Sequence, residues 1–444
     1  MIKYLIAGVE SFQKGGVPEA VRDFMAGAKD GLILLDESSK IKTSNPCRTS
    51  AKSKRTQAVV SLNSSAWRRG ILTGTFMNKS PVDSYDQMEF LQKRFFGCDM
   101  YSFAERHTVR VSLPIGRGIR TLITPEIWGA VHRRLAAARA KGPDWHTAAL
   151  TYCFTQHKLT QEAAVWVETH EAYTPFMHVD EIWSAVSPCC MVVRKQDCTD
   201  LPPKAYSVVR VALSDRMKKL YKMLLATGFT DNTVADNSMS MYHQLQDICN
   251  GYEPYTDTDG NTSMKRVCSD KMDALDAVLD SIDLTKHQAV IWANRSVFLS
   301  DIHAHVKEHT GLMCAKYDGG TPEAMRELVK KRFMSGECRI VCINQGTGSY
   351  GLDCLGSADY AVYMSNDYSV ERRVQSEDRI DRYREGKERK TIIDIECAGT
   401  VDEKVTENLK LGIELIRSGK TDPSVFGLYD SSVLSWKSGE PVVF

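Results

Sequence analysis

Residues 32–37 read LILLDE, four apolar residues followed by two adjacent carboxylates. The apolar run predicts a fully buried strand, and Asp36 and Glu37 follow its C-terminal end, where ligands bind in open α/β sheets. In P-loop NTPases an Asp at this place holds Mg²⁺, and the following Glu orients or deprotonates the attacking water. A strand that ends in an ordinary polar turn explains the pattern equally well, so this stretch alone leaves the function open.

Strand and helix patterns alternate on both sides of this stretch. In the first part of the chain, strands are predicted at residues 4–7, 32–35 and 70–73, with helices at residues 18–25 and 49–62. Farther on, strands are predicted at 289–293, 339–343, 360–364 and 391–395, and helices at 297–309, 322–334, 369–384 and 401–417. Such alternation predicts an α/β fold with parallel sheets that carry helices on both faces.

Residues 106–190 differ from both α/β regions because they show helical patterns and few strand signals. The Pro-Pro pair at residues 202–203 then punctuates the chain as a linker does. The sequence therefore predicts a partial α/β lobe at 1–105, a mainly helical insertion and linker at 106–200, and a complete α/β lobe at 201–444.

Composition excludes several classes of protein. The chain has 444 residues, of which 43% are hydrophobic and 25% charged, with a net charge of +1. These values are ordinary for a globular protein. The apolar runs fall far short of the ~20 residues that cross a bilayer, so no membrane partner is expected. Thirteen scattered Cys without a Cys-x-x-Cys pair indicate reduced thiols, and the first residues lack a signal-peptide pattern, so a cytoplasmic protein is expected.

Basic residues are concentrated in one region although the net charge is almost zero. Between Glu37 and Asp83 the chain has nine Lys and Arg and no acidic residue. On charge alone, a phosphate-binding surface and a solvated loop-and-helix face explain this run about equally well. The nine are Lys40, Lys42, Arg48, Lys52, Lys54, Arg55, Arg68, Arg69 and Lys79.

Residues 375–382 read QSEDRIDR, which places Gln375, Arg379 and Arg382 on one face of a predicted helix. Two guanidiniums on one face can reach a single anion, which suits the charge that develops on a γ-phosphate during transfer. Acidic residues are interleaved with them, so a solvated helix with internal salt bridges remains the alternative for this segment taken alone.

Taken together and in this order, the segments resemble the engines of helicase superfamily two. Within it they resemble the Swi/Snf-type DNA translocases, especially the compact forms encoded by bacteriophages, over nearly the whole chain. Phe76 departs from the family, which usually has Pro there, and residues 383–385 depart from its common Gly-Gln ending. The similar segments are 36–42 (Walker B), 72–81 (motif III), 194–204 (the bridge between lobes), 245–250 (a helix in the second lobe), 346–353 (motif V) and 375–382 (motif VI).

The resemblance implies two RecA-like lobes and an ATP-dependent DNA helicase or translocase that uses Mg²⁺. Asp36 would hold the metal and Glu37 would activate water, while Arg379 and Arg382 reach across from the second lobe with support from Gln375. DNA would be held through its backbone, without sequence preference. The resemblance also assigns coupling, nucleic-acid or phosphate contacts to Thr73, Gly74, Thr75, Lys40, Lys42, Asn294, Thr347 and Gly348, and places Gly351 and Asp353 near the nucleotide.

One element that ATP-driven helicases need is absent from the sequence. Their phosphates lie in a Gly-x₄-Gly-Lys-Ser/Thr loop, whereas the only Gly-Lys-Thr here, at residues 419–421, has Glu414 in place of the first Gly and follows a helical pattern. We expect a first lobe without its opening strands and, as one partner, a separate chain that carries the P-loop half. The alternative is a remnant or split subunit that binds DNA or a partner without turnover of its own. A viral origin would place it in the host cytoplasm.

Two further motifs match other families only formally. Residues 346–351 give G-x-G-x-x-G, the dinucleotide fingerprint, but the eight residues before Tyr360 are too few for a crossover helix. Residues 305–309 give H-x-x-E-H, the inverted zincin pattern, without a downstream Glu constellation. Neither a dehydrogenase nor a metalloprotease is therefore expected.

Overall fold

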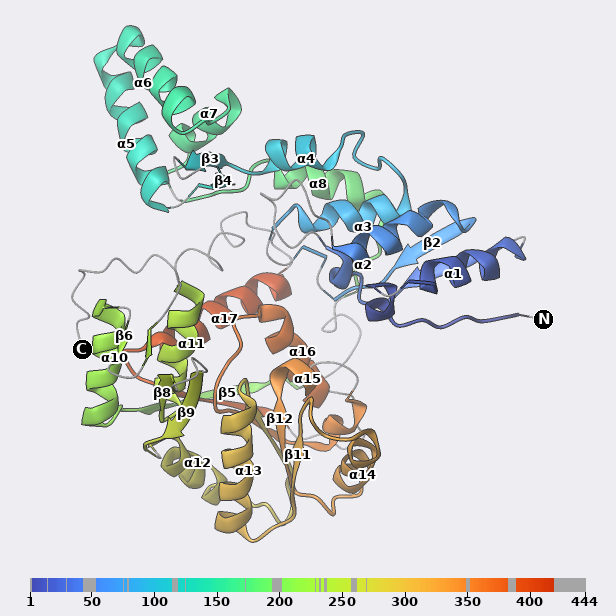
Figure 1. Ribbon diagram of the computed structural model, residues 1–444, viewed down its shortest axis with the longest axis vertical. Coiled ribbons are helices and arrows are strands. Elements are labelled where there is room, and N and C mark those ends of the chain that lie inside the picture. Colours follow the sequence, from blue (N-terminus) through green and yellow to red (C-terminus); the bar gives the residue numbers. More distant parts are fainter. Residues whose placement is uncertain are drawn as a thin grey trace. The chain divides into compact units, whose positions relative to one another are not determined.

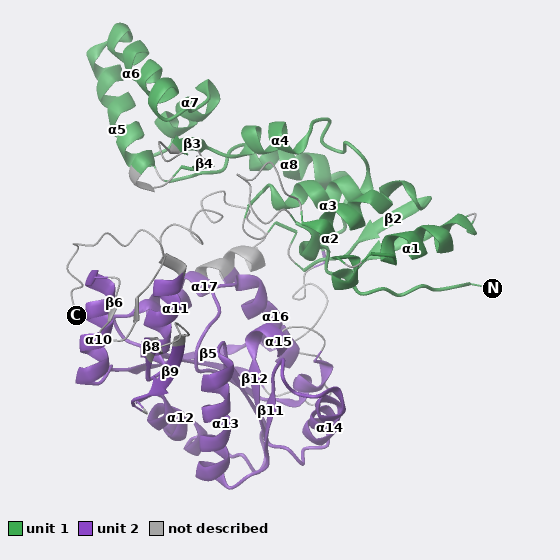
Figure 2. Ribbon diagram, in the orientation of Figure 1, with its two compact units in different colours: residues 1–192, 418–435 green, residues 193–417, 436–444 purple. Residues whose placement is uncertain are grey.

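The protein is described by a computed structural model, in which the chain forms two compact units, residues 1–192 and residues 193–417 (Figure 2). None of the helices in the described ranges combines the length and the hydropathy of a membrane span. The structure describes residues 2–418 except 14, 29, 43–52, 75, 78–79, 114–118, 124, 172, 194–201, 228, 231–232, 235–237, 257–261, 269, 349–351 and 382–388.

The first unit begins with a two-stranded parallel sheet and the helices packed on one face of it (Figure 1). Strand β1 (Leu32–Leu35) pairs in parallel register with β2 (Arg68–Ile71). Apolar residues from the helices meet Ile33 and Leu35 in one cluster, because side chains alternate along a strand and only one set faces the helices. These helices are α1 (Val17–Ala26), α2 (Lys54–Val60) and α3 (Asp83–Leu91), with 3₁₀ turns at Val9–Gln13, Ser38–Ile41 and Ser61–Ser64.

The bounds predicted for β1 are confirmed, but its predicted complete burial is wrong. The side chains of Leu32 and Leu34 are 58% and 56% exposed, whereas Leu35 is buried. An apolar run of four residues does not reveal that no described helix of the unit covers the side chains of Leu32 and Leu34 on one face of the sheet. The strand predicted at 4–7 is also wrong, since residues 2–8 form no strand and Tyr4 is exposed. Strand β2 lies two residues earlier than predicted.

The rest of the first unit is mainly helical, as predicted, and includes one β-hairpin that the sequence analysis missed. The hairpin joins β3 (Arg110–Leu113) to β4 (Ile119–Leu122) in antiparallel register. Side chains from β3, α5, α6 and α7 share an apolar cluster around Trp128 and Leu135. The helices are α4 (Met100–His107), α5 (Pro125–Lys141), α6 (Pro143–Gln156), α7 (Gln161–Thr169) and α8 (Val179–Val186), with a 3₁₀ turn at Ser187–Cys189.

The second unit is built on a six-stranded sheet in which every neighbouring pair is parallel. Its order is β11-β12-β10-β13-β14-β5. The strands are β5 (Ala205–Val211), β10 (Ala289–Ala293), β11 (Cys314–Tyr317), β12 (Ile340–Asn344), β13 (Tyr360–Tyr363) and β14 (Thr391–Cys397); two small hairpins pair β6 (Phe229–Thr230) with β7 (Thr233–Val234) and β8 (Tyr252–Thr256) with β9 (Thr262–Arg266).

Helices cover both faces of this sheet. Ile291 of β10 belongs to the cluster formed with α12 and α13, whereas Val290 and Trp292 belong to the cluster formed with α14 and α16. All five residues of β10 are buried as a result, and the predicted α/β class with parallel sheets is confirmed. The helices are α10 (Asp215–Thr227), α11 (Ser238–Cys249), α12 (Asp270–Asp280), α13 (Ser296–Thr310), α14 (Glu323–Met334), α15 (Gln345–Gly348), α16 (Val370–Ile380) and α17 (Val401–Ser418), with a 3₁₀ turn at Asp353–Ser357.

Candidate functional sites

In the first unit, the β1–β2 ladder continues past the strands and brings two predicted motifs together. The amide of Leu72 donates to the carbonyl of Leu35 at 2.9 Å, and the amide of Ser38 donates to the carbonyl of Leu72 at 3.0 Å. Asp36 and Glu37 therefore stand beside the start of the predicted motif III. Thr73 and Gly74 follow directly, while Thr75 lies outside the described residues.

The backbone fixes the two carboxylates at this turn. Glu37 adopts a left-handed conformation with φ of 51°, which is uncommon for a residue other than Gly. Its amide donates to Oδ1 of Asp36 at 2.9 Å. The 3₁₀ turn that starts at Ser38 then leads the chain away, so both acidic side chains lie at the end of β1.

The buried side chain of Gln87 connects the Asp36–Glu37 turn to the motif III segment. Its Oε1 accepts from the hydroxyl of Ser38 at 2.6 Å, and its Nε2 donates to the carbonyl of Phe76 at 2.7 Å. A shift of either loop would therefore disturb the other. The sequence analysis missed Gln87, because a single Gln in a helix gives no sign of its distant partners.

The basic run between Glu37 and Asp83 is partly used inside the unit. Lys40 forms an ion pair with Glu10 at 2.9 Å, and this hydrogen bond lowers the pKa of Glu10. Arg69 donates to the carbonyls of Leu91 and Ala66 at 2.8 and 2.7 Å. Arg48, Lys52 and Lys79 lie outside the described residues, and the remaining basic residues are Lys42, Lys54, Arg55 and Arg68.

In the second unit, polar side chains link the C-terminal ends of three adjacent strands. Asn294 follows β10, and its Nδ2 donates to Oε1 of Gln246 on α11 at 2.7 Å. Its Oδ1 accepts from the hydroxyl of Ser365 after β13, also at 2.7 Å, and its carbonyl accepts from Asn344 of β12 at 3.0 Å. The amide group of Asn294 thus holds the strand ends together in this structure.

Helix α16 is anchored to the sheet by Arg373, a buried residue that the sequence analysis missed. Its guanidinium donates to both carboxylate oxygens of Asp394 on β14, at 2.6 and 3.0 Å, and to Oε1 of Glu377 at 2.9 Å. It also lies 3.5 Å from the ring centroid of Tyr363. Burial raises the pKa of Glu377, but the charges of Arg373 and of Lys204, 3.2 Å away, outweigh it and lower the pKa to about 2.

The same helix carries two of the three predicted motif VI residues. Nη1 of Arg379 lies 3.5 Å from Oδ1 of Asp353, so motifs V and VI meet at this point. Gln375 lies one turn earlier, and its Oε1 is buried without a hydrogen-bond partner among the described residues. Helix α16 ends at Ile380, earlier than predicted, and Arg382 lies outside the described residues.

Motif V starts where β12 ends. Thr347 and Gly348 lie in the short helix α15, and Gly351 lies outside the described residues. A methyl group on Gly348 would lie 2.2 Å from Cγ2 of Ile343 and 2.7 Å from Cζ3 of Trp292, so close packing requires Gly there.

Comparison with known proteins gives a family match in the second unit. Residues 270–384 match the helicase conserved C-terminal domain. The matched segment includes Asn294, Gln375 and Arg379, so the strand-edge network and helix α16 lie within the part of the chain that is similar to this domain.

Two curated relatives extend the match. Over 228 residues the chain is 26% identical to Protein CHROMATIN REMODELING 5 of Arabidopsis thaliana, which covers 47% of the chain and 13% of the relative. Over 327 residues it is 23% identical to Nuclear protein STH1/NPS1 of Saccharomyces cerevisiae, covering 67% of the chain and 23% of the relative. The chain therefore spans less than a quarter of either relative. The chain is thus similar to a helicase domain in its second unit and to parts of two much longer proteins.

Solved structures also resemble the chain. The C-terminal part of the Fun30 ATPase domain matches 49% of this chain and 99% of its own length, with a TM-score of 0.37 and 15% identity. The Sulfolobus solfataricus SWI2/SNF2 ATPase core in complex with dsDNA matches 96% of this chain and 74% of its own, with a TM-score of 0.36 and 16% identity.

The H-x-x-E-H histidines lie within residues 270–384, and each makes a hydrogen-bond contact with a carboxylate. Nε2 of His305 lies 2.8 Å from Asp276, and Nε2 of His309 lies 2.9 Å from Asp280, both on α12. These contacts join α13 to α12. They give the motif a structural use that needs no metal.

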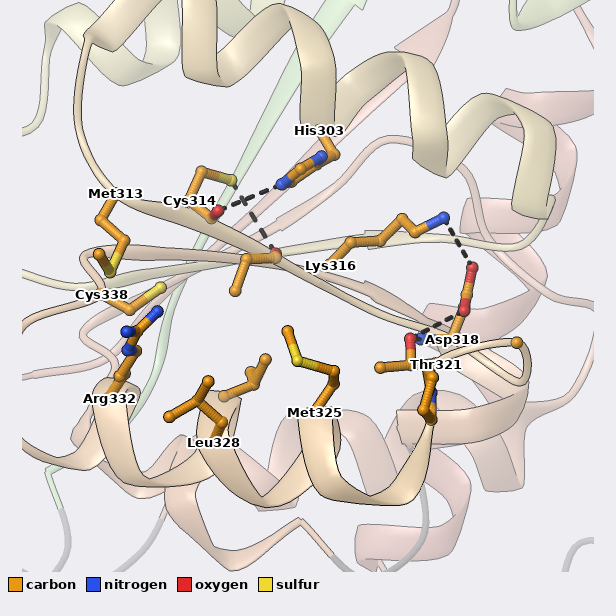
Figure 3. A pocket seen from close by; sticks show the side chains of 14 residues that line it. His303, Met313, Cys314, Lys316, Asp318, Thr321, Met325, Leu328, Arg332 and Cys338 are labelled. Atoms are coloured by element: carbon orange, nitrogen blue, oxygen red, sulfur yellow. Dashed lines mark hydrogen bonds and ion pairs between the residues drawn. The ribbon is translucent and has the colours of Figure 1, made fainter.

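A pocket of about 500 Å³ lies along the edge strand β11, between α13 and α14 (Figure 3). Its polar side chains are paired with one another: Lys316 lies 3.2 Å from Asp318, and Thr321 donates to Asp318 at 2.9 Å. Burial raises the pKa of Asp318, but these two partners outweigh it and lower the pKa. None of the predicted site residues lines this pocket.

Proposed function

We propose that the protein is a DNA motor of the Swi/Snf type, which couples ATP hydrolysis to movement on DNA or to its remodelling. The observation that carries the proposal is the ladder of hydrogen bonds that places Asp36 and Glu37 beside Thr73. The match of residues 270–384 to the helicase C-terminal domain supports it from the second unit. A compact bacteriophage-type form and a cytoplasmic location stay predictions of the sequence resemblance.

The donor groups of the first unit fit Mg²⁺. Carboxylate oxygens are the hard ligands that this ion prefers, and Oδ1 of Asp36 is already oriented by the amide of Glu37. Asp36 would hold the ion through a water molecule, and Glu37 would accept the proton of the attacking water. The ion itself would neutralise phosphate charge when the nucleotide is bound.

The second unit would supply positive charge to the transferred phosphate. Arg373 and its buried carboxylates fix helix α16, so Arg379 is presented on a rigid element, as electrostatic stabilisation requires. Gln375 and Arg382 would act on the same helix and just after it. Asp353, beside Arg379, would lie near the nucleotide.

The phosphate cradle is the part that these residues do not fit, since the sequence has no P-loop. A separate chain that carries the P-loop half is therefore part of the proposal. The exposed side chains of Leu32 and Leu34 support it, because parallel sheets are normally covered on both faces. The missing P-loop taken alone favours the second candidate, a split subunit or remnant that binds DNA or a partner without turnover of its own.

ATP hydrolysis by the purified chain, measured with and without DNA, tests the proposal. We expect weak or no turnover by the chain alone. Strong DNA-stimulated turnover that Glu37→Gln abolishes would support the motor and show that the chain has a phosphate site of its own. Turnover that survives both Glu37→Gln and Arg379→Gln would refute the roles assigned here.

DNA binding separates the motor from unrelated enzymes. We expect sequence-tolerant binding whose affinity falls steeply as salt rises, because cations hold the phosphate backbone. Fluorescence anisotropy with two duplexes of unrelated sequence measures it. A folded chain that binds neither duplex at low salt would contradict the proposed function.

A further inference from the structure

Helices α5 and α6 form a hairpin whose outer surface is used by neither candidate site. The two helices lie side by side, and the inner side chains of Trp128, Leu135 and Cys153 are buried in a cluster shared with α7 (Figure 1). An apolar core therefore holds the hairpin together. Its outward-facing side chains are not needed for that packing.

The surroundings of this hairpin are strongly basic. Residues 108–160 contain eight Lys and Arg and only two acidic residues, Glu126 and Asp144, in a chain whose net charge is +1. Arg139 is used within the unit, because it pairs with Glu168 at 2.9 Å. A set of three other cations on α5 is exposed, and no carboxylate in the described part of the chain pairs with them; the set is Arg133, Arg134 and Lys141.

Two exposed aromatic rings stand beside these cations. The guanidinium of Arg134 lies 3.5 Å from the ring centroid of Tyr152, and the ammonium of Lys141 lies 5.0 Å from that of Trp145. Trp145 is 61% exposed and Tyr152 is 40% exposed. The two cations are seven positions apart on α5 and the two rings seven positions apart on α6, so the pairs lie roughly 10 Å apart at 1.5 Å per residue.

We propose that this surface, formed by Arg133, Arg134, Lys141, Trp145 and Tyr152 and called the arm surface, binds an unpaired strand of nucleic acid. Its cations would contact phosphates, while the indole ring and the guanidinium plane offer flat faces on which bases stack. Duplex DNA would use the cations but has no free base faces to offer. An acidic protein would likewise explain the charge but not the exposed Trp.

The arm-surface proposal rests on the proposed function only in assuming that the protein binds nucleic acid. It adds that an unpaired strand is bound and that the α5–α6 hairpin binds it. A motor that keeps one unpaired strand on this hairpin would act on DNA that is locally open. The nucleotide chemistry at Asp36 and Glu37 is not needed for this binding, so the two can be tested separately.

The first experiment measures the charge contribution with the full chain. Affinity for a labelled oligothymidylate is followed by fluorescence anisotropy over a range of salt concentrations. The triple variant Arg133→Gln/Arg134→Gln/Lys141→Gln should make the negative slope of log K against log salt shallower by about 2, at roughly 0.7 per lost contact. The matched control is Lys218→Gln/Lys219→Gln/Lys222→Gln on α10, which should leave the slope unchanged.

The second experiment measures stacking. Trp145→Ala changes an exposed side chain, so the fold is retained, and it should weaken oligothymidylate binding roughly tenfold while leaving duplex binding nearly unchanged. Trp145→Phe keeps an aromatic face and should restore most of the affinity. The oligonucleotide should also quench indole fluorescence in the wild type more than in Trp145→Phe.

An unchanged salt slope in the triple variant would overturn the proposal. Equal losses for single strand and duplex with Trp145→Ala, or no loss for either, would overturn the assignment to an unpaired strand. Competition by poly-glutamate as strong as by the oligonucleotide would point to an acidic protein instead. If oligonucleotide binding depends on Trp145 while the folded chain binds neither duplex at low salt, the arm surface stands and the proposed function fails.

Discussion

Replacing Arg373 by Met should destabilise the second unit strongly. In the native structure this guanidinium neutralises Glu377 and Asp394, both buried, with donor–acceptor distances of 2.6–3.0 Å. Met fills similar volume but leaves Asp394 without its cation and Glu377 with Lys204 alone. Removing one partner of a buried ion pair costs about 3–5 kcal/mol, which is a large part of the 5–15 kcal/mol that typically holds a domain together.

Hydrogen exchange of peptides from β13 and β14 measures this loss in the second unit alone. The matched control is Arg332→Met on α14, whose pair with Glu337 at 3.4 Å is exposed and should cost less than about 1 kcal/mol. The double variant Arg373→Met/Asp394→Asn should lose less stability than Arg373→Met, because the buried carboxylate left without a cation is removed. A cost for Arg373→Met as small as that of the control would refute the reasoning.

Three other perturbations test particular contacts. The pKa of Glu377 is lowered from 4.5 to about 2, so its contribution of about 3 kcal/mol is present above pH 4.5 and is lost as the pH falls toward 2; Glu377→Gln should flatten urea-unfolding stability over that range. Gly348→Ala should cost about 1–3 kcal/mol in thermal unfolding, since the methyl group would overlap Ile343. Asp353→Asn removes the carboxylate 3.5 Å from Arg379 and should change stability by less than about 1 kcal/mol, while ATP binding measured by calorimetry should strengthen; weaker binding would instead make Asp353 a nucleotide ligand.

The parts of the fold that could be predicted are the strands at the centre of a covered sheet. β10 reads AVIWA and is buried on both faces, so its apolar run shows it directly. The two strands of this sheet that the sequence analysis missed, β5 and β11, are its two edges. Edge strands carry polar and exposed side chains such as Lys316 and Tyr206, and their pattern is therefore weaker.

The positions of candidate site residues were predictable where these residues are neighbours in the sequence. Asp36 and Glu37 are adjacent in the sequence and lie at the end of their strand, as expected. The residues that fix the site were missed because their partners are remote. Lys204 and Glu377 are 173 positions apart, and Asn294 meets Gln246 across 48 positions, so only the folded chain shows these pairs.

The two units differ in how far their polar groups are paired and their apolar residues covered within the unit itself. In the second unit, the strand ends are closed by internal hydrogen bonds around Asn294 and by the buried charges around Arg373, so helix α16 needs no further partner to be rigid. In the first unit, Leu32 and Leu34 remain exposed on a two-stranded parallel sheet. A P-loop segment packed on this face would cover these leucines and would also bring the phosphate cradle to Asp36. One proposed P-loop segment therefore accounts for two separate observations, an exposed apolar face and a missing motif, and this is why we favour a motor over a degenerate remnant.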